Sequence, residues 1–103
     1  MSPITTHVLN TVSGRPAAGI VVTIEIDGKR LGESITDPDG RVRDLLTAGH
    51  RLLPGLYCLR FQTAAVSVFF PEIAIHFRIE NPDQHYHVPL LLSAYGYTTY
   101  RGS

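Results

Sequence analysis

The chain has 103 residues, the size of one domain, so residues 1–103 are expected to form a single unit around one hydrophobic core. Nine basic and nine acidic side chains give a net charge of zero without a basic run, which argues against nucleic acids and anionic membranes as partners. A lone cysteine excludes a disulfide framework, and the lack of a membrane-length apolar run or a secretory signature predicts a cytoplasmic protein.

The first part of the chain predicts two strands joined by a loop. The β-branched run of residues 4–9 indicates a strand, and the turn-forming residues 13–19 indicate the loop that follows it. Residues 20–27 alternate, which is typical of a strand with one buried face and one face in water. The predicted buried face comprises Ile20, Val22, Ile24 and Ile26.

Two tight turns organise the next segment. Asp-Gly at residues 27–28 is a strong hairpin signal, so residues 29–36 are expected to pair back on the preceding strand. In Asp-Pro-Asp-Gly at residues 37–40, proline fixes φ, aspartate bonds the nearby backbone, and glycine accepts a positive φ. Residues 41–43 are expected to leave this turn as a short strand.

The second half predicts further strands. Residues 47–55 form a loop, and residues 56–63 form a strand with alternating apolar side chains. Residues 64–70 have no clear assignment. They are compatible with a strand, but proline would end that strand at Pro71. Residues 72–80 alternate again and predict another half-buried strand.

A final turn at residues 81–83 leads into a strand that begins at the two histidines of residues 85–87. No stretch of the chain shows convincing helical periodicity. Seven or eight short strands separated by frequent turns predict an all-β protein, an antiparallel β-sandwich.

The histidines are the first candidates for chemistry. On the opening strand His7 shares a face with Thr5, and on the closing strand His85 shares a face with His87. Two histidines at that spacing allow a metal site, although no third ligand has an obvious place. The alternative is a polar strip on a strand whose other face is core. For His7 alone, a structural role is the commoner one for a strand histidine beside threonines.

Arg41 and the tail complete the set. Arg41 follows the second tight turn, and an arginine held at an interface needs a carboxylate partner, for which a terminal carboxylate at Ser103 is one candidate. The chain has no nucleophile elbow, phosphate-binding loop or carboxylate pair. What remains is histidine acid–base chemistry with arginine charge stabilisation, which suits hydrolysis of a small anionic or carbonyl-rich molecule by activated water.

The same stretches are similar to one known family. They are Ile-Thr-Thr-His-Val-Leu-Asn at 4–10, Gly-Arg-Pro-Ala at 14–17, Thr-Asp-Pro-Asp-Gly-Arg at 36–41, Phe-Phe-Pro-Glu-Ile at 69–73, His-Tyr-His-Val-Pro-Leu-Leu-Leu-Ser at 85–93 and Tyr-Arg-Gly-Ser at 100–103. Together they resemble the 5-hydroxyisourate hydrolases, also called transthyretin-like proteins. The closing motif is the most specific of these matches.

The resemblance implies a transthyretin-like antiparallel β-sandwich of two four-stranded sheets. It also implies a homotetramer, a dimer of dimers, with active sites at the dimer–dimer interface and the tetrapeptide tail lining each site. The implied reaction is hydrolysis of 5-hydroxyisourate to 2-oxo-4-hydroxy-4-carboxy-5-ureidoimidazoline in urate and purine catabolism. Neither a cofactor nor a metal is expected.

The resemblance also implies roles for particular residues. His7 and His87 are expected to orient and deprotonate water and then to protonate the leaving ring nitrogen. Arg41 is expected to bind a substrate carbonyl oxygen, and Ser103 to position a histidine or the substrate. The residues implied to contact the substrate are His7, Arg41, Tyr100, Arg101 and Gly102.

The chain departs from the family pattern at a few positions. Asn10 replaces a frequent Asp, Ala94 a frequent Pro and Thr98 a frequent Ser, all outside the chemical set. The segment from Thr63 to Phe70 is shorter than in the family, where a short helix is usual, so the sequence does not decide whether this helix forms.

Two other functions compete with a hydrolase. Transthyretin has this fold and carries thyroid hormone in a channel between dimers, but such a carrier does not need His7, His87 and the tail. A structural β-sandwich module is the second alternative, and it predicts a monomer with a mobile tail.

Overall fold

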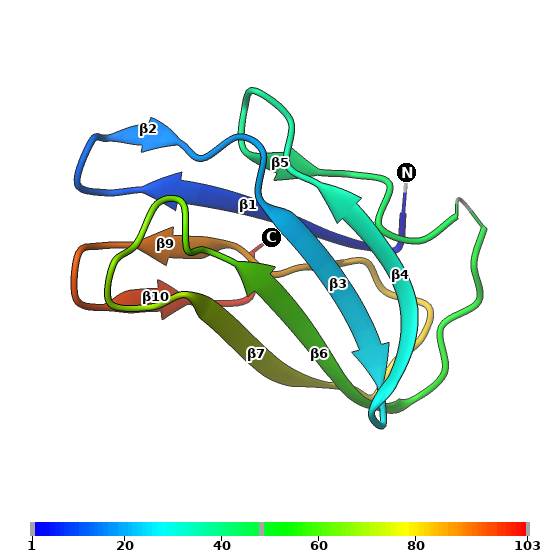
Figure 1. The fold of residues 1–103 in the computed structure, drawn as a ribbon. Coiled ribbons are helices and arrows are strands. Elements are labelled where there is room, and N and C mark those ends of the chain that lie inside the picture. Colours follow the sequence, from blue (N-terminus) through cyan, green and yellow to red (C-terminus); the bar gives the residue numbers. More distant parts are fainter. Residues whose placement is uncertain (1, 48, 103) are drawn as a thin grey trace.

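The computed structural model describes residues 2–47 and 49–102, and this described part contains strands and turns but no helix. The strands are β1 (Ile4–Asn10), β2 (Arg15–Pro16), β3 (Val21–Ile26), β4 (Lys29–Ile35), β5 (Arg41–Val42), β6 (Gly55–Gln62), β7 (Glu72–Ile79), β8 (Tyr86–His87), β9 (Leu90–Leu92) and β10 (Tyr97–Thr99). They form two layers whose strands run in different directions (Figure 1). The predicted all-β sandwich is therefore confirmed. Within the described chain, no helix has the length and apolar character needed to cross a membrane.

The first layer is a four-stranded antiparallel sheet in the order β4-β3-β6-β7. It begins with the predicted hairpin, in which Asp27 and Gly28 both have positive φ, of 48° and 82°. This geometry matches the twist of the flanking strands, which is why Asp-Gly favours such a turn. Glycine adopts it without strain because it has no Cβ.

The second layer contains six strands instead of the expected four, and it is mixed rather than wholly antiparallel. The six strands nevertheless occupy four positions. β1 is central, β5 and β2 follow one another along one side of it, β8 and β9 follow one another along the other side, and β10 pairs outside β9. One cause of the division is Pro89, which separates β8 from β9 and has no N–H to donate to a ladder.

In one segment the structure differs from the prediction, and in another it settles what the sequence left open. The loop predicted for residues 13–19 contains β2, which pairs with the end of β1 on the outer side of the sheet. Pro16 is tolerated there because an edge strand does not need every N–H. The open segment from Thr63 to Phe70 forms a tight turn, in which the N–H groups of Val66 and Ser67 both donate to the Thr63 carbonyl. The usual helix of the family is not formed.

The core lies between the two sheets. Most side chains of the predicted inward faces are buried, with Ile24, Leu59 and Phe61 inaccessible to water, whereas Ile26 is only half-buried. The other sheet contributes Val8 and Leu90, also fully buried. Alternation works here because each sheet turns one face to the other and removes those side chains from water.

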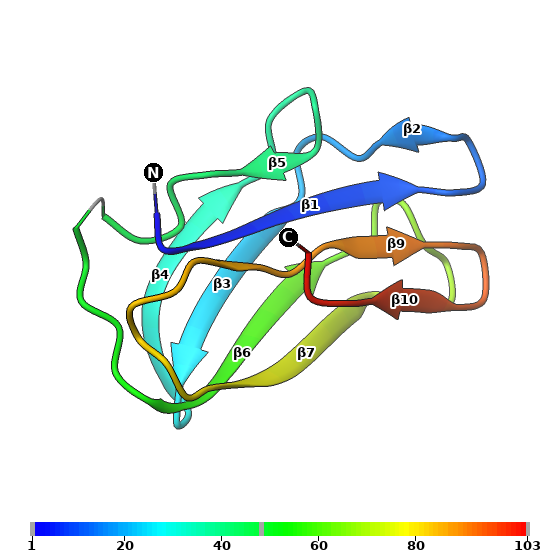
Figure 2. The same cartoon turned by 180° about the vertical axis from the view of Figure 1, so that it is seen from behind.

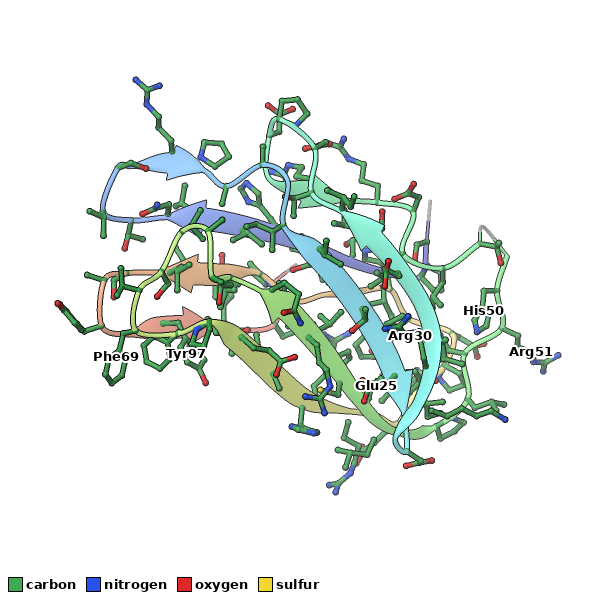
Figure 3. All side chains as sticks on the ribbon, in the orientation of Figure 1. Glu25, Arg30, His50, Arg51, Phe69 and Tyr97 are labelled. Atoms are coloured by element: carbon green, nitrogen blue, oxygen red, sulfur yellow. The ribbon has the colours of Figure 1, made fainter. Side chains whose placement is uncertain are left out.

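The two ends of the sandwich differ in character. Phe69 and Tyr97 lie at one end, and His50 and Arg51 lie at the other (Figure 3). At the aromatic end, Phe69 contacts Tyr95 and Phe70 contacts Tyr97, both edge to face. Figure 2 shows the chain turning after β10, and an isolated bridge then pairs Gly102 with His87 of β8.

Candidate active site

Strand register brings the candidate residues of three distant segments together around β1. His7 of β1 lies directly opposite Arg41 of β5. On the other side of β1, Thr5 lies opposite His87 of β8. Thr5 and His7 are two residues apart and therefore share one face of the strand. One face of the six-stranded sheet thus holds two histidines and an arginine.

A pocket of about 410 Å³ lies on this part of the sheet. Its lining is polar and cationic, and it comprises Thr5, Thr6, Arg41, Arg43, His85, His87, Tyr100 and Gly102. Of the predicted site residues, Arg41, His87, Tyr100 and Gly102 therefore meet at the pocket. His7 is not among the lining residues and instead lies beside the pocket, opposite Arg41.

The predicted tight turn fixes the start of the Arg41 side chain. The carboxylate of Asp37 accepts hydrogen bonds from the backbone N–H groups of Asp39 and Arg41, each at 2.9 Å. The Arg41 N–H is the main cause that holds the pKa of Asp37 below its usual range. The Gly40 carbonyl in turn accepts the Val8 N–H at 2.7 Å, which attaches the turn to β1.

His87 is held through its ring by a hydroxyl group and through its backbone by the tail. Its Nδ1 lies 2.8 Å from Thr5 Oγ1, and its backbone carbonyl accepts the Gly102 N–H at 2.7 Å. Burial, followed by the charges of Arg41, His7 and His85, lowers the pKa of His87 below its ordinary value of 6.5. A neutral imidazole beside guanidinium groups is suited to accept a proton at neutral pH.

The tail is attached by its arginine and by its backbone. Arg101 lies over the ring of Tyr86 at 4.4 Å and donates to the Gln84 side-chain oxygen at 3.0 Å. Its guanidinium group is therefore occupied outside the pocket, whereas Tyr100 and Gly102 line the pocket. Ser103, the fourth predicted catalytic residue, lies outside the described residues.

Sequence reasoning did not single out Thr6 or Arg43 for the site. The signal for Arg43 is its spacing, because a residue two positions after Arg41 on a strand lies on the same face. Arg43 also forms an ion pair with Asp37 at 3.5 Å. Two arginines in one pocket favour an anionic or carbonyl-rich ligand, because both offer only donors.

The possible metal site at His85 and His87 has a different arrangement in the structure. Both rings contact the hydroxyl of Thr5, His85 through Nε2 at 2.9 Å and His87 through Nδ1. Across residues 2–47 and 49–102, His, Cys, Asp and Glu side chains form no group of three or more that could hold a metal ion. Cys58 is buried in the four-stranded sheet, so the pocket contains no thiol nucleophile.

Known proteins show the same fold and similar sequences. The profile of the HIUase/transthyretin family matches residues 4–102. A 5-hydroxyisourate hydrolase of Caulobacter vibrioides is 45% identical over 117 aligned positions, which cover all of both chains. The structure of Klebsiella pneumoniae 5-hydroxyisourate hydrolase superposes with a TM-score of 0.84 at 32% identity, covering 97% of this chain and 98% of that one. Sea bream transthyretin in complex with thyroxine superposes with a TM-score of 0.85 at 26% identity, covering 98% and 95%.

Proposed function

The chain belongs to the HIUase/transthyretin family, and from that premise we propose that it hydrolyses 5-hydroxyisourate in the pocket beside β1. The observation that supports this most is the meeting of His87, Arg41 and the backbone of Gly102 at one pocket. The identity to named hydrolases over the whole chain supports the same substrate.

In the proposed reaction, His87 is the general base and takes a proton from the attacking water. Its lowered pKa keeps the ring neutral, as a base must be. The water oxygen then bonds to a ring carbonyl carbon of the substrate, and the amide bond from that carbon to nitrogen breaks. The leaving nitrogen receives the proton that His87 has taken up, and the product is 2-oxo-4-hydroxy-4-carboxy-5-ureidoimidazoline.

Arg41 stabilises the negative charge that develops on the carbonyl oxygen. A fixed donor in a water-poor site is effective because it needs no reorganisation during the reaction. His7, opposite Arg41, orients the water or the substrate. Tyr100 and Gly102 close one wall of the pocket, Arg101 anchors that wall on Tyr86, and Ser103 positions a histidine or the substrate.

We also propose that the working unit is a homotetramer, a dimer of dimers, with each pocket at the dimer–dimer interface. The support is the position of the pocket on the outward face of the six-stranded sheet, where a second copy of the same face would cover it. Covering the pocket would exclude bulk water and strengthen the electrostatic effect of Arg41.

A transthyretin-like carrier is the alternative. The likeness to a thyroxine complex of sea bream transthyretin supports the fold for both functions. What favours the hydrolase is the lining, because two arginines and two histidines supply charge and proton-transfer groups that are not needed to hold an apolar ring.

The test is the decay of freshly generated 5-hydroxyisourate, followed by ultraviolet absorbance, with the product identified by ¹³C NMR. Because the substrate also decays unaided, the comparison is with the same solution lacking protein. We expect a protein-dependent acceleration that yields the ureidoimidazoline. Tight binding of thyroxine without any acceleration would instead favour the carrier.

A further inference from the structure

The hydroxyl of Thr5 lies between two imidazole rings, and this is the contact from which a further role follows. Thr5 Oγ1 is 2.9 Å from Nε2 of His85 and 2.8 Å from Nδ1 of His87. The Thr5 side chain is only 5% exposed, so water has little access to compete for the hydroxyl. Among the described residues the hydroxyl has no third hydrogen-bond partner.

The proton count at this hydroxyl restricts the two rings. A threonine hydroxyl has one proton to donate and lone pairs to accept. Between these two rings, the hydroxyl donates that proton to one ring nitrogen, and the other ring donates an N–H to it. The tautomers of His85 and His87 are therefore coupled, and two chains are possible. Either His87 donates to Thr5 and Thr5 to His85, or the direction is reversed.

The surroundings of the two rings favour the first direction. His85 is exposed, so water can satisfy its other nitrogen in either tautomer. His87 is half-buried and lines the pocket together with Arg41 and Arg43, and Nε2 is the ring nitrogen that remains on it. Guanidinium groups offer only donors and repel another N–H, so a lone pair at Nε2 is the better match.

We propose that Thr5 is a positioning residue which, together with His85, holds neutral His87 in the form protonated at Nδ1 and leaves Nε2 free to accept a proton. The role rests on the proposed function, because a free Nε2 is what a general base for water needs. It is the same task that an orienting acceptor performs for the histidine of a catalytic triad. Thr5 acts through its contact with the ring of His87.

The test combines a spectroscopic readout with a rate. In protein labelled with ¹⁵N-histidine, the ring nitrogens of His87 are assigned by their loss in His87→Gln. We expect wild type at neutral pH to show Nδ1 with the shift of a protonated nitrogen and Nε2 with that of an unprotonated one. This measurement does not depend on activity, so it stands even if the protein fails to hydrolyse 5-hydroxyisourate.

Three variants then separate positioning from general structure. Thr5→Val removes the hydroxyl at nearly constant volume, and we expect His87 to move toward the Nε2-protonated form with a fall in kcat of about 10- to 100-fold. Thr5→Ser restores the hydroxyl and should restore both the tautomer and most of the rate. The matched control is Thr99→Val, which removes a hydroxyl of the same sheet that donates to the Pro89 carbonyl at 2.8 Å and contacts neither ring.

Several results would overturn the proposal. One is an Nε2-protonated His87 in wild type, and it applies even if Thr5→Val does not fold. Another is a folded Thr5→Val with an unchanged tautomer and kcat. A third is a Thr5→Ser variant that is as impaired as Thr5→Val, because then shape and not the hydroxyl would matter. If wild type shows the predicted tautomer but no hydrolysis, the proposed function fails while the tautomer assignment remains.

Discussion

At Gly102 the lack of a side chain decides how closely the tail approaches the imidazole of His87. A Cβ at this position would lie 2.6 Å from His87 Cδ2 and 3.3 Å from Cγ. No Cβ is found at the shorter distance in proteins, so either the tail or the ring must move. Because the Gly102 N–H also donates to the His87 carbonyl, the two cannot separate without losing that hydrogen bond.

We therefore predict that Gly102→Ala lowers kcat/KM for 5-hydroxyisourate by about 100-fold, the cost of displacing a catalytic group by about 1 Å. Thermal stability should change little, because the site lies on the outer face of the sheet. Gly96→Ala is the matched control, since a Cβ there would meet only Ser93 Oγ at 3.4 Å. Equal activity in the two variants would contradict the prediction.

The ionisation of His87 gives a second prediction at the scale of one residue. Burial is the main cause of its lowered pKa, and Arg41 is the next. In an NMR titration the pKa of His87 should therefore lie below 6.5. In Arg41→Gln this pKa should rise but remain below 6.5, because the burial persists. A value above 6.5 in wild type would contradict this account.

The same shift has a consequence for stability, with a definite sign. Below about pH 6.5 His87 binds a proton more readily in the unfolded chain than in the folded chain. The free energy of unfolding should then decrease as the pH falls from about 6.5 toward the lowered pKa, and it should be unaffected by this group at higher pH. His87→Gln should weaken that dependence.

At the scale of elements, the turn between β4 and β5 connects local sequence to the site. Gly40 has a φ of +75°, and a Cβ on it would lie 2.4 Å from the Val8 carbonyl oxygen. Both the backbone conformation and the contact with β1 thus require glycine. The turn is what delivers Arg41 to its place opposite His7.

We predict that Gly40→Ala reduces stability and activity together, in contrast to Gly102→Ala. Strain in the left-handed region costs about 1–3 kcal/mol, and the clash with β1 adds to it. Thermal unfolding and kcat/KM measured on the same samples would check this. A variant of wild-type stability with wild-type kcat/KM would show that the turn does not determine where Arg41 lies.

Elements with strong local signals were predictable from the sequence, and elements defined by distant partners were not. Alternation at Ile20–Ile26 and Asp-Gly at residues 27–28 give β3 and its hairpin, because a half-buried strand and a positive φ are local requirements. The short strand β2 exists only because β1 lies beside it, and the division of the predicted closing strand into β8 and β9 likewise depends on its place beside β1. No local pattern encodes such a neighbour, and Pro16 argued for a loop.

The candidate site divides in the same way. The resemblance of the closing motif and the tight turn brought attention to His87 and Arg41, which meet at one pocket. The double contact of Thr5 and the anchoring of Arg101 on Tyr86 depend on side chains that come together only in the folded chain. Period-two spacing placed Thr5 on the right face but gave it no role.

At the scale of the whole molecule, one end of the sandwich exposes many apolar side chains. Val68 is fully exposed, Tyr95 is 79% exposed, and Phe69 and Val12 are also exposed. Clustered exposure of this kind on a small domain is typical of a surface that another protein covers. This exposure agrees with the proposed homotetramer, in which the covering protein is another copy of this chain.

We predict that the protein sediments as four copies of its 11.4 kDa chain in analytical ultracentrifugation. Tyr95→Asp should shift the distribution toward smaller species, because a charge is costly to bury without a partner. Glu33→Gln, on the exposed strand β4, is a control that should leave the distribution unchanged. A wild-type monomer at micromolar concentration would contradict the proposal that the pocket lies between copies.

The most direct test of the central claim compares three proteins in the 5-hydroxyisourate decay assay. They are wild type, Arg41→Ala and the matched control Arg51→Ala, whose arginine lies in an exposed loop at one end of the sandwich (Figure 3). The account predicts that wild type and Arg51→Ala accelerate the decay equally, and that Arg41→Ala, still folded, loses about 10²–10³ of the rate. Full activity in a folded Arg41→Ala, or no acceleration by wild type, would contradict it.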